Sequence, residues 1–304
     1  VAAILAAGTF VILYPFSAQF ATMAPQRGAD DALFGSETLW WQTESLLSGN
    51  LDHYFDNPIY FPMKNTLAYS DYFPSSLPFF VPAYLLSHNP FFAHNLTVLL
   101  SYVVTGLCMY LFMLYVTRSF AAALLAGVMF AFLPSRINHL AHLNLMQMGV
   151  IPLVFLAFKA YCDAPGLKRA GLVALACWIM VLTNGQLLVF SIIPILIFLT
   201  THAIGNRLLQ RPEFYGQMLL AFVVLAAAAT PFLYPYLHFR DEMLFFRSTE
   251  QLDCAVLKNY LGIDPSNRLW GRALKGMGSW ERYLFNGVLP LMLGLIGAWQ
   301  VRER

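Results

Sequence analysis

The chain has 304 residues, of which 59% are hydrophobic and only 11% are charged, and its mean hydropathy is +0.60. Soluble domains carry roughly 25% charged residues, so this composition excludes a soluble domain. The net charge of +2 provides no strong overall field for attracting nucleic acid, and we expect no nucleic-acid partner.

Eight apolar segments predict membrane spans, each of which needs about 20 mostly apolar residues. We therefore expect an all-α polytopic membrane protein with about eight transmembrane helices, in which residues 1–304 form a single transmembrane domain. Because residue 1 is Val and the chain stops just after an apolar segment, we also expect a fragment of a longer chain. The predicted spans are 1–20, 95–116, 120–133, 149–161, 170–183, 187–202, 217–236 and 284–299.

Lys and Arg in short loops predict the orientation in the membrane, because they are enriched on the cytoplasmic side. With a cytoplasmic N-terminus, the opposite short loops hold only Arg136. Both long loops, 21–94 and 237–283, are then extracytoplasmic. The basic residues that fall on the cytoplasmic side are Arg118, Lys168, Arg169, Arg207, Arg211, Arg302 and Arg304.

The first long loop, 21–94, holds seven of the 16 acidic residues, opposed by Arg27 and Lys64. Within it, residues 37–48 predict an amphipathic helix on the membrane surface, with Trp40 and Trp41 in the headgroup layer. Repeated Asn-Pro and Phe-Pro pairs predict an ordered irregular loop after this helix, followed by a second short interfacial helix at 76–86. Tyr and Phe at 54–61 and 69–73 are expected to pack within the loop, with stacking on sugar rings as the alternative.

Three acidic residues of this loop are candidates for chemistry. Asp30 and Asp31 lie just before the surface helix, where a carboxylate facing a cavity is able to deprotonate a hydroxyl group. Asp71 is a candidate second acid or metal ligand. The alternatives are a solvated loop or helix N-cap for the pair and a turn for Asp71, and spacing alone favours these alternatives.

Arg136, His139 and His142 form a further candidate cluster at the outer end of the third span. Each is three residues from the next, so they share a face on a helical turn. A cation with two imidazoles suits a phosphate, and a metal would need a third ligand such as Asp31 or Asp71. The alternative is anchoring to lipid headgroups. Asn184 and Gln186, between two later spans, are expected only to satisfy a tight turn.

The chain is laid out as one span, then a long outer loop with an early Asp and an interfacial helix, and then a bundle of spans joined by short loops. This layout resembles the integral-membrane glycosyltransferases of the GT-C superfamily, in an uncharacterised bacterial branch. The resemblance covers most of the chain. The strings that carry it are Asp31 with Trp41 and Leu46-Leu47; Asn57-Pro58-Ile59-Tyr60-Phe61-Pro62; Asn65-Thr66-Leu67-Ala68-Tyr69-Ser70-Asp71; Pro134-Ser135-Arg136 with His139 and His142; and Glu281 with Leu284-Phe285-Asn286-Gly287.

The resemblance implies an enzyme of the bacterial inner membrane that moves a sugar from a polyprenyl-phosphate donor to a cell-envelope acceptor on the outer face, with inversion at the sugar carbon. Asp31, with Asp30 as its neighbour, would be the base. Arg136, His139 and His142 would hold the donor phosphate, and Arg268 or Arg272 would close over it. Many relatives have a further acid in the outer loop that here contains Arg136, His139 and His142. Whether the enzyme needs a divalent metal therefore stays open.

Two other classes of function remain as alternatives. A transporter or lipid flippase predicts paired ionisable residues in mid-membrane, and the spans contain few. A non-catalytic subunit of a larger membrane complex predicts that Asp31 and Arg136 are replaceable and that a groove packs on a partner protein. The partners expected from the sequence are thus a polyprenyl-phosphate-linked sugar, membrane lipid and, for the subunit alternative, other proteins.

Overall fold

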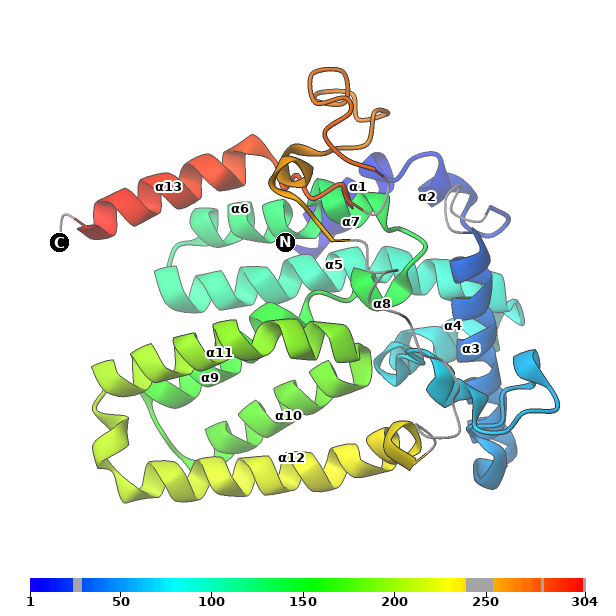
Figure 1. Ribbon diagram of the computed structural model, residues 1–304, viewed down its shortest axis with the longest axis horizontal. Helices are drawn as coiled ribbons and strands as arrows, with labels where there is room; N and C mark the ends of the chain where they lie inside the picture. The colour runs from blue at the N-terminus through cyan, green and yellow to red at the C-terminus, as the bar shows by residue number, and fades with distance from the viewer. Residues whose placement is uncertain (24–28, 239–253, 280–281, 303–304) are drawn as a thin grey trace.

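The computed structural model describes residues 1–23, 29–238, 254–279 and 282–302, which form helices and irregular loops without strands (Figure 1). Arg27, Glu281, Arg304 and residues 239–253 of the second long loop lie outside the described residues. The all-α architecture expected from the composition is confirmed for the described part of the chain.

Five helices are long and apolar enough to cross a membrane, which indicates an integral membrane protein. Two of them combine a short and a long helix, which the sequence did not predict. The five are α5 (Pro90–Thr117), the run Phe120–Asn138 with α6 (Phe120–Ala131) and α7 (Pro134–Asn138), the run Leu143–Asp163 with α8 (Leu143–Met146) and α9 (Val150–Asp163), α11 (Gly185–Gly205) and α12 (Pro212–His238).

The other three predicted spans form shorter helices. They are α1 (Ala2–Ile12), α10 (Leu167–Thr183) and α13 (Val288–Arg302), with 11, 17 and 15 residues. In the first predicted span, Pro15 follows the end of α1 and the chain turns into the short helix α2 (Phe16–Gln19). The described residues therefore support five spans by length and composition, where eight were expected.

The long helices run side by side, and the connections that follow α5, α9 and α11 lie at one end of the bundle (Figure 1). Arg118 and Arg207 lie in two of these connections, and Lys168 lies in the first turn of α10, after the third. The basic residues thus gather at one end, as the orientation argument requires. Which side of the membrane this end faces remains a prediction.

Helix α3 (Ala29–Ser48) runs across the opposite end of the bundle rather than alongside the long helices (Figure 1). It begins eight residues before the predicted start, with Asp30 and Asp31 in its first turn, where a carboxylate is favoured by the helix dipole. Along this helix Leu39 is buried, Leu46 and Leu47 are exposed, and the polar Gln42 is buried as well.

The Gln42 amide explains why a polar residue faces inward. It donates to the carbonyl of Tyr72 at 2.7 Å and accepts from the Tyr54 hydroxyl at 2.7 Å, so it ties α3 to the loop that follows. That loop contains four short 3₁₀ turns and leads to α4 (Leu77–Ser87), which confirms an ordered irregular loop and a second short helix. The turns are Leu51–His53, Pro58–Tyr60, Thr66–Tyr69 and Pro74–Ser76.

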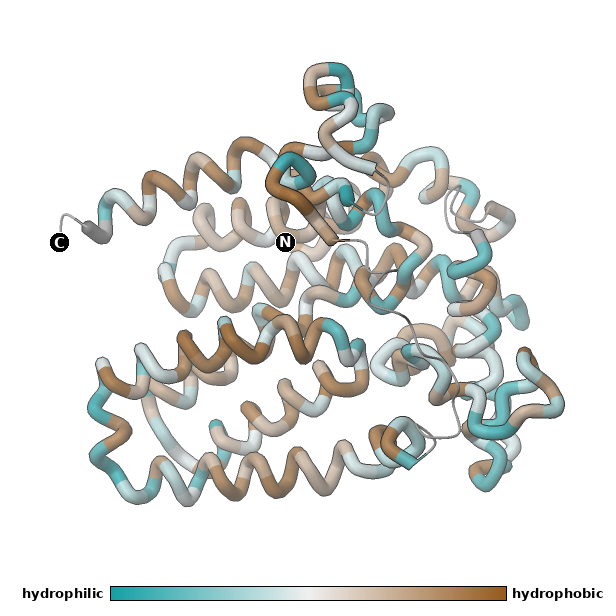
Figure 2. Tube along the Cα trace, in the orientation of Figure 1, coloured by the Kyte–Doolittle hydropathy of each residue, from teal (hydrophilic) through white to brown (hydrophobic). Residues whose placement is uncertain are grey.

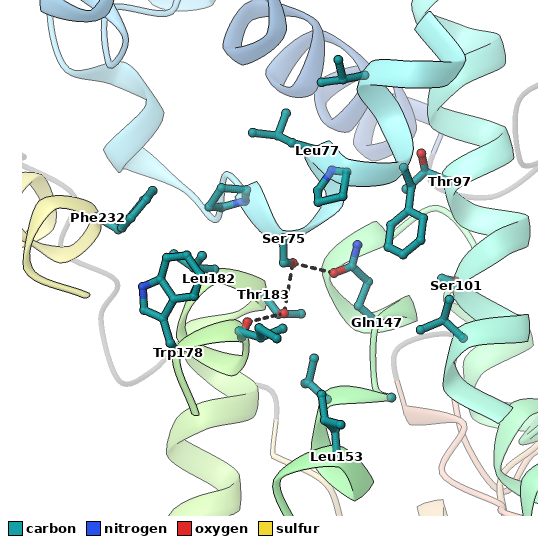
Figure 3. Close-up of a pocket in the computed structure, with 18 of the residues that line it drawn as sticks. Ser75, Leu77, Thr97, Ser101, Gln147, Leu153, Trp178, Leu182, Thr183 and Phe232 are labelled. Carbon is teal, nitrogen blue, oxygen red and sulfur yellow. Dashed lines mark hydrogen bonds between the residues drawn. The ribbon is translucent and has the colours of Figure 1, made fainter. Parts of the chain in front are cut away.

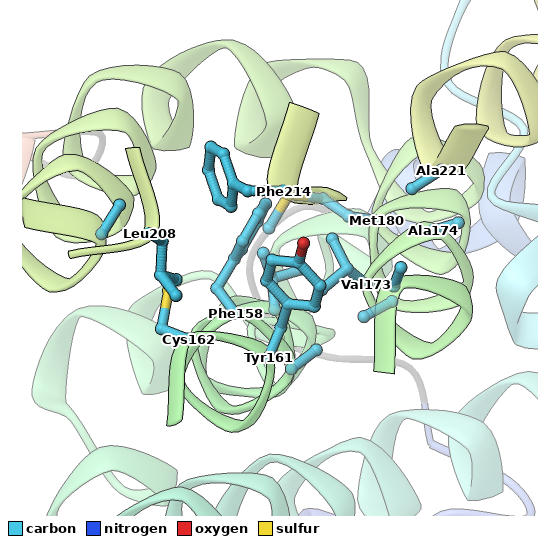
Figure 4. Packing of buried hydrophobic residues seen from close by; sticks show 14 of the residues in the cluster. Phe158, Tyr161, Cys162, Val173, Ala174, Met180, Leu208, Phe214 and Ala221 are labelled. Carbon is cyan, nitrogen blue, oxygen red and sulfur yellow. The ribbon is translucent and has the colours of Figure 1, made fainter. Parts of the chain in front are cut away.

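The main apolar core lies between α9, α10, α11 and α12 (Figure 4). Half of the residues in the apolar stretch of the Leu143–Asp163 run are buried, whereas 17% are buried in the corresponding stretches of α11 and α12. Large apolar side chains on α11 and α12, such as Phe190 and Phe222, are exposed and available to lipid, and both helices are coloured as hydrophobic in Figure 2. The Leu143–Asp163 run is therefore interior, whereas α11 and α12 form the periphery.

Two further contacts join other elements. Helices α5 and α6 pack closely at Gly127, where an added Cβ would lie 2.7 Å from the carbonyl oxygen of Gly106. The described part of the second long loop contains a 3₁₀ turn at Leu257–Leu261. The residues between this loop and α13 meet α7 through a hydrogen bond of 3.2 Å from the Ser135 hydroxyl to the Asn286 side chain.

Candidate functional site

Asp31 and His142 meet at the end of the bundle that α3 crosses. The Oδ2 atom of Asp31 lies 3.3 Å from Nε2 of His142, although 111 residues separate them in the chain. Asp31 comes from the first turn of α3, and His142 is the residue before α8. The Asp31 side chain is 52% exposed and that of His142 24%, so the carboxylate has a partner on one side and open space on another.

His139 lies against His142, with the ring centroids 5.3 Å apart and the rings nearly perpendicular. Burial lowers the pKa of His139, and the neighbouring imidazole lowers this pKa further. His139 is therefore neutral at pH 7, which favours a role in packing or hydrogen bonding over one as a cation for phosphate.

Arg136 lies inside the protein, where its side chain is 2% exposed. Its guanidinium group donates to the carbonyls of Ala131 and Met146, and it stands over the Tyr102 ring at 4.3 Å from the centroid. A third contact, of 3.3 Å, reaches the Thr105 hydroxyl. All these contacts are internal, so the phosphate contact expected from the sequence has no support from the position of Arg136. The residue instead joins α5, the end of α6 and α8.

Asp71 is half-buried and accepts a hydrogen bond of 3.0 Å from Asn144 Nδ2. Asn144 is two residues after His142, so residues 142–144 contact both Asp31 and Asp71. The described residues contain no group of three or more His, Cys, Asp or Glu side chains arranged to hold a metal ion.

The remaining predicted site residues lie apart from the Asp31–His142 pair. Asp30 lines a separate cavity of about 420 Å³ with Glu37 and Trp40. Arg268 and Arg272 are exposed in the segment 254–279.

A large apolar cavity of about 1050 Å³ opens between α4, α5, α9, α10 and α12 (Figure 3). Three of its polar side chains are bonded to one another: Ser75 donates to Gln147 at 2.7 Å, and Thr183 donates to Ser75 at 3.0 Å. The sequence does not predict this cavity, because its walls come from elements far apart in the chain. Its apolar lining includes Leu77, Leu153, Trp178, Leu182 and Phe232.

A second, more polar cavity of about 560 Å³ adjoins the apolar one, and we call it the polar cavity. The two cavities share the wall residues Pro74, Leu182, Thr183 and Phe232. Two residues of the polar cavity, Asn184 and Gln186, were expected only to satisfy a tight turn, and Asn184 does cap α11 there. The polar and aromatic residues that line the polar cavity are Tyr69, Ser70, Asp71, Tyr72, Phe73, Thr183, Asn184, Gln186, Phe232 and Tyr236.

Comparisons with protein families, with curated proteins and with solved structures found no match to this chain.

Proposed function

We propose that this protein is a membrane glycosyltransferase of the GT-C type, which moves a sugar from a polyprenyl-phosphate donor to a cell-envelope acceptor on the extracytoplasmic face. The observation that carries the proposal is the contact between Asp31 and His142, two residues singled out from the sequence on separate grounds. A half-exposed carboxylate held by an imidazole at the end of an apolar helix bundle is a suitable general base.

In the proposed reaction, Asp31 removes the proton from an acceptor hydroxyl group. The hydroxyl oxygen bonds to the anomeric carbon of the donor sugar from the face opposite the phosphate. The bond between that carbon and the phosphate oxygen breaks, and polyprenyl phosphate leaves with the electron pair. His142 orients the Asp31 carboxylate through its Nε2 atom.

The apolar cavity supports a lipid-linked donor, because its lining suits an isoprenoid chain and offers few free polar groups. Its walls include α5, α9 and α12, which belong to runs that are long and apolar enough to span a membrane, so a chain in it would remain in an apolar environment. Arg268 and Arg272, both exposed, remain the proposed partners of the donor phosphate.

The proposal is tested by replacing Asp31 with Asn and measuring polyprenyl phosphate released from a panel of synthetic polyprenyl-phosphate hexoses, with bacterial envelope lipids as acceptors. We expect the rate to fall by about 10²–10⁴-fold, which is the usual contribution of a general base. His142→Gln should cause a smaller fall, of roughly tenfold, because the contact that orients the Asp31 carboxylate is weakened.

Two matched substitutions control for the loss of a carboxylate. Asp52→Asn changes an exposed residue of the same loop and should leave the rate unchanged. Asp30→Asn distinguishes the two adjacent acids, since Asp30 lines a different cavity. The role of Asp31 would be contradicted if Asp31→Asn released polyprenyl phosphate at the wild-type rate, or if only Asp30→Asn lowered that rate.

A further inference from the structure

The polar cavity combines one carboxylate, two amides and several tyrosine rings beside the apolar cavity. We propose that it binds a neutral sugar ring. The inference that this ring is one part of a larger acceptor, separate from the hydroxyl group that Asp31 deprotonates, rests on the proposed function, whereas the binding itself does not. Its volume of about 560 Å³ is within the range of roughly 300–1,000 Å³ that small-molecule sites occupy.

The charge of the lining argues for a neutral ligand that donates hydrogen bonds. Asp71 is the charged residue among the residues that line the cavity, and no Lys, Arg or His accompanies it there. A phosphate or carboxylate ligand would be repelled by Asp71, because nothing in the lining offsets its charge. One bond from Asn144 uses part of the accepting capacity of Asp71, and the carboxylate has sites left for ligand hydroxyl groups.

Two amides supply the complementary donors. The Asn184 side chain is 2% exposed, and its oxygen accepts from the backbone N–H groups of Gln186 and Leu187. Its Nδ2 atom is buried and has no hydrogen-bond partner in the described structure. The Gln186 side chain is exposed beside it.

Tyrosine rings give the cavity a rigid aromatic wall. Tyr72 and Tyr236 stack with their centroids 5.7 Å apart. Their hydroxyl groups donate to the carbonyls of Phe232 and Ser70, at 2.9 Å and 2.7 Å, so both rings are held at each end. Fixed aromatic faces next to a carboxylate and amides suit a sugar, which presents apolar C–H faces and a rim of hydroxyl groups.

The test uses the full chain in lipid nanodiscs, free of alkyl-glycoside detergent, because such a detergent would itself compete for a sugar site. The probe is a methyl hexoside that carries a photoreactive diazirine, with unlabelled methyl glucoside, mannoside and galactoside as competitors. After irradiation, mass spectrometry of peptides locates the label. We expect it within 68–74, 183–187 or 232–236, with displacement by at least one neutral glycoside and little displacement by a hexose phosphate.

Two variants link the labelling to the proposed contacts. Asp71→Asn and Gln186→Ala should each lower labelling by about fivefold to tenfold, since each loses a hydrogen bond to the ligand. Gln186 is exposed, so its replacement should leave the fold intact, and Asp52→Asn is the matched control for the lost carboxylate. Absence of label from the cavity peptides, or unchanged labelling in both variants, would overturn the proposal.

The outcome is separable from that of the transfer reaction. Asp31→Asn should keep normal labelling, because Asp31 does not line the polar cavity. A chain that labels normally but transfers no sugar would retain the sugar site and lose the proposed function. A chain that transfers sugar but is not labelled would retain the proposed function and lose the sugar site.

Discussion

At the scale of single residues, Arg136 is notable because its side chain contacts three elements. Its planar guanidinium group reaches two backbone carbonyls from different helices and also covers the Tyr102 ring. A lysine carries one ammonium group and is unable to bridge both carbonyls in this geometry. The contribution of Arg136 should therefore be to stability, through the join between α5, α6 and α8.

We predict that Arg136→Lys lowers the thermal unfolding midpoint by roughly 3–10 °C, because at least one hydrogen bond to a charged group, about 1.5–3 kcal/mol, is lost. The midpoint is measured by intrinsic fluorescence in nanodiscs. Arg118→Lys is the matched control, since Arg118 is exposed at the end of α5 and covers only Tyr115. Equal midpoints for Arg136→Lys and wild type would refute the bridging role.

The candidate site shows what sequence could and could not predict about residues. The pattern around 136–142 indicated chemistry, but spacing gives no burial, so Arg136 was expected at the surface and lies inside. Asp31 and His142 were each identified, but their contact depends on the position of α3 across the bundle. Asn184 was predicted to satisfy a turn, and its buried unpaired Nδ2 atom is a property of the fold alone.

At the scale of elements, close approach of α5 and α6 depends on a glycine. A methyl group at Gly127 would meet the backbone oxygen of Gly106 at 2.7 Å and the Cβ atom of Tyr110 at 3.2 Å. Backbone atoms are unable to rotate away as a flexible side chain would. Small residues serve this purpose widely where membrane helices pack.

We predict that Gly127→Ala destabilises the protein by about 1–3 kcal/mol through overpacking. Gly171→Ala is the matched control, because Gly171 is an exposed residue of α10 with open space around its Cβ position. That substitution should instead be neutral or stabilising by up to about 1 kcal/mol, since alanine favours a helix. Denaturant unfolding of both variants measures the difference, and a similar loss in both would argue against the close contact.

Sequence patterns identified most elements because apolar length is a direct property of the chain. Helices α5, α11 and α12 include the predicted segments and extend past them by a few residues, which is the usual error at helix ends. The burial of a polar residue in α3 was not predicted, because the loop after it supplies the polar partners. Gln42 is buried through its bonds to Tyr72 and Tyr54, and no helical period reveals such partners.

At the scale of the whole molecule, orientation is the main open prediction. The exposed Cys254 lies in the second long loop, while the other three cysteines are buried or partly buried. In intact cells, a membrane-impermeant maleimide should therefore label the wild-type chain at Cys254. After Cys254→Ser, the replacement Asp52→Cys should restore labelling and Arg207→Cys should not, because the two residues lie at opposite ends of the bundle.

Labelling of Arg207→Cys in intact cells, with none of Asp52→Cys, would reverse the orientation and put the Asp31–His142 pair in the cytoplasm. Permeabilised cells are the control, in which both replacements should react.

The cavities could not be predicted from the sequence, because their walls join residues from α3 to α12. The sequence indicated that helices would pack, but not which side chains would leave space between them. The lengths of the predicted spans were uncertain for a related reason: apolar content alone does not distinguish a helix of full membrane length from a shorter one such as α1 or α13.

The unequal burial of the long helices has a consequence for how the chain tolerates mutation over evolutionary time. On α11 and α12, most positions face outward, and one apolar side chain can replace another at little cost as long as lipid still covers it. On α9, much of the surface contacts other parts of the protein, so a change of even one methylene group is felt. Natural variation should therefore accumulate on the peripheral helices, and a position on α9 that does not vary would report packing before it reports chemistry.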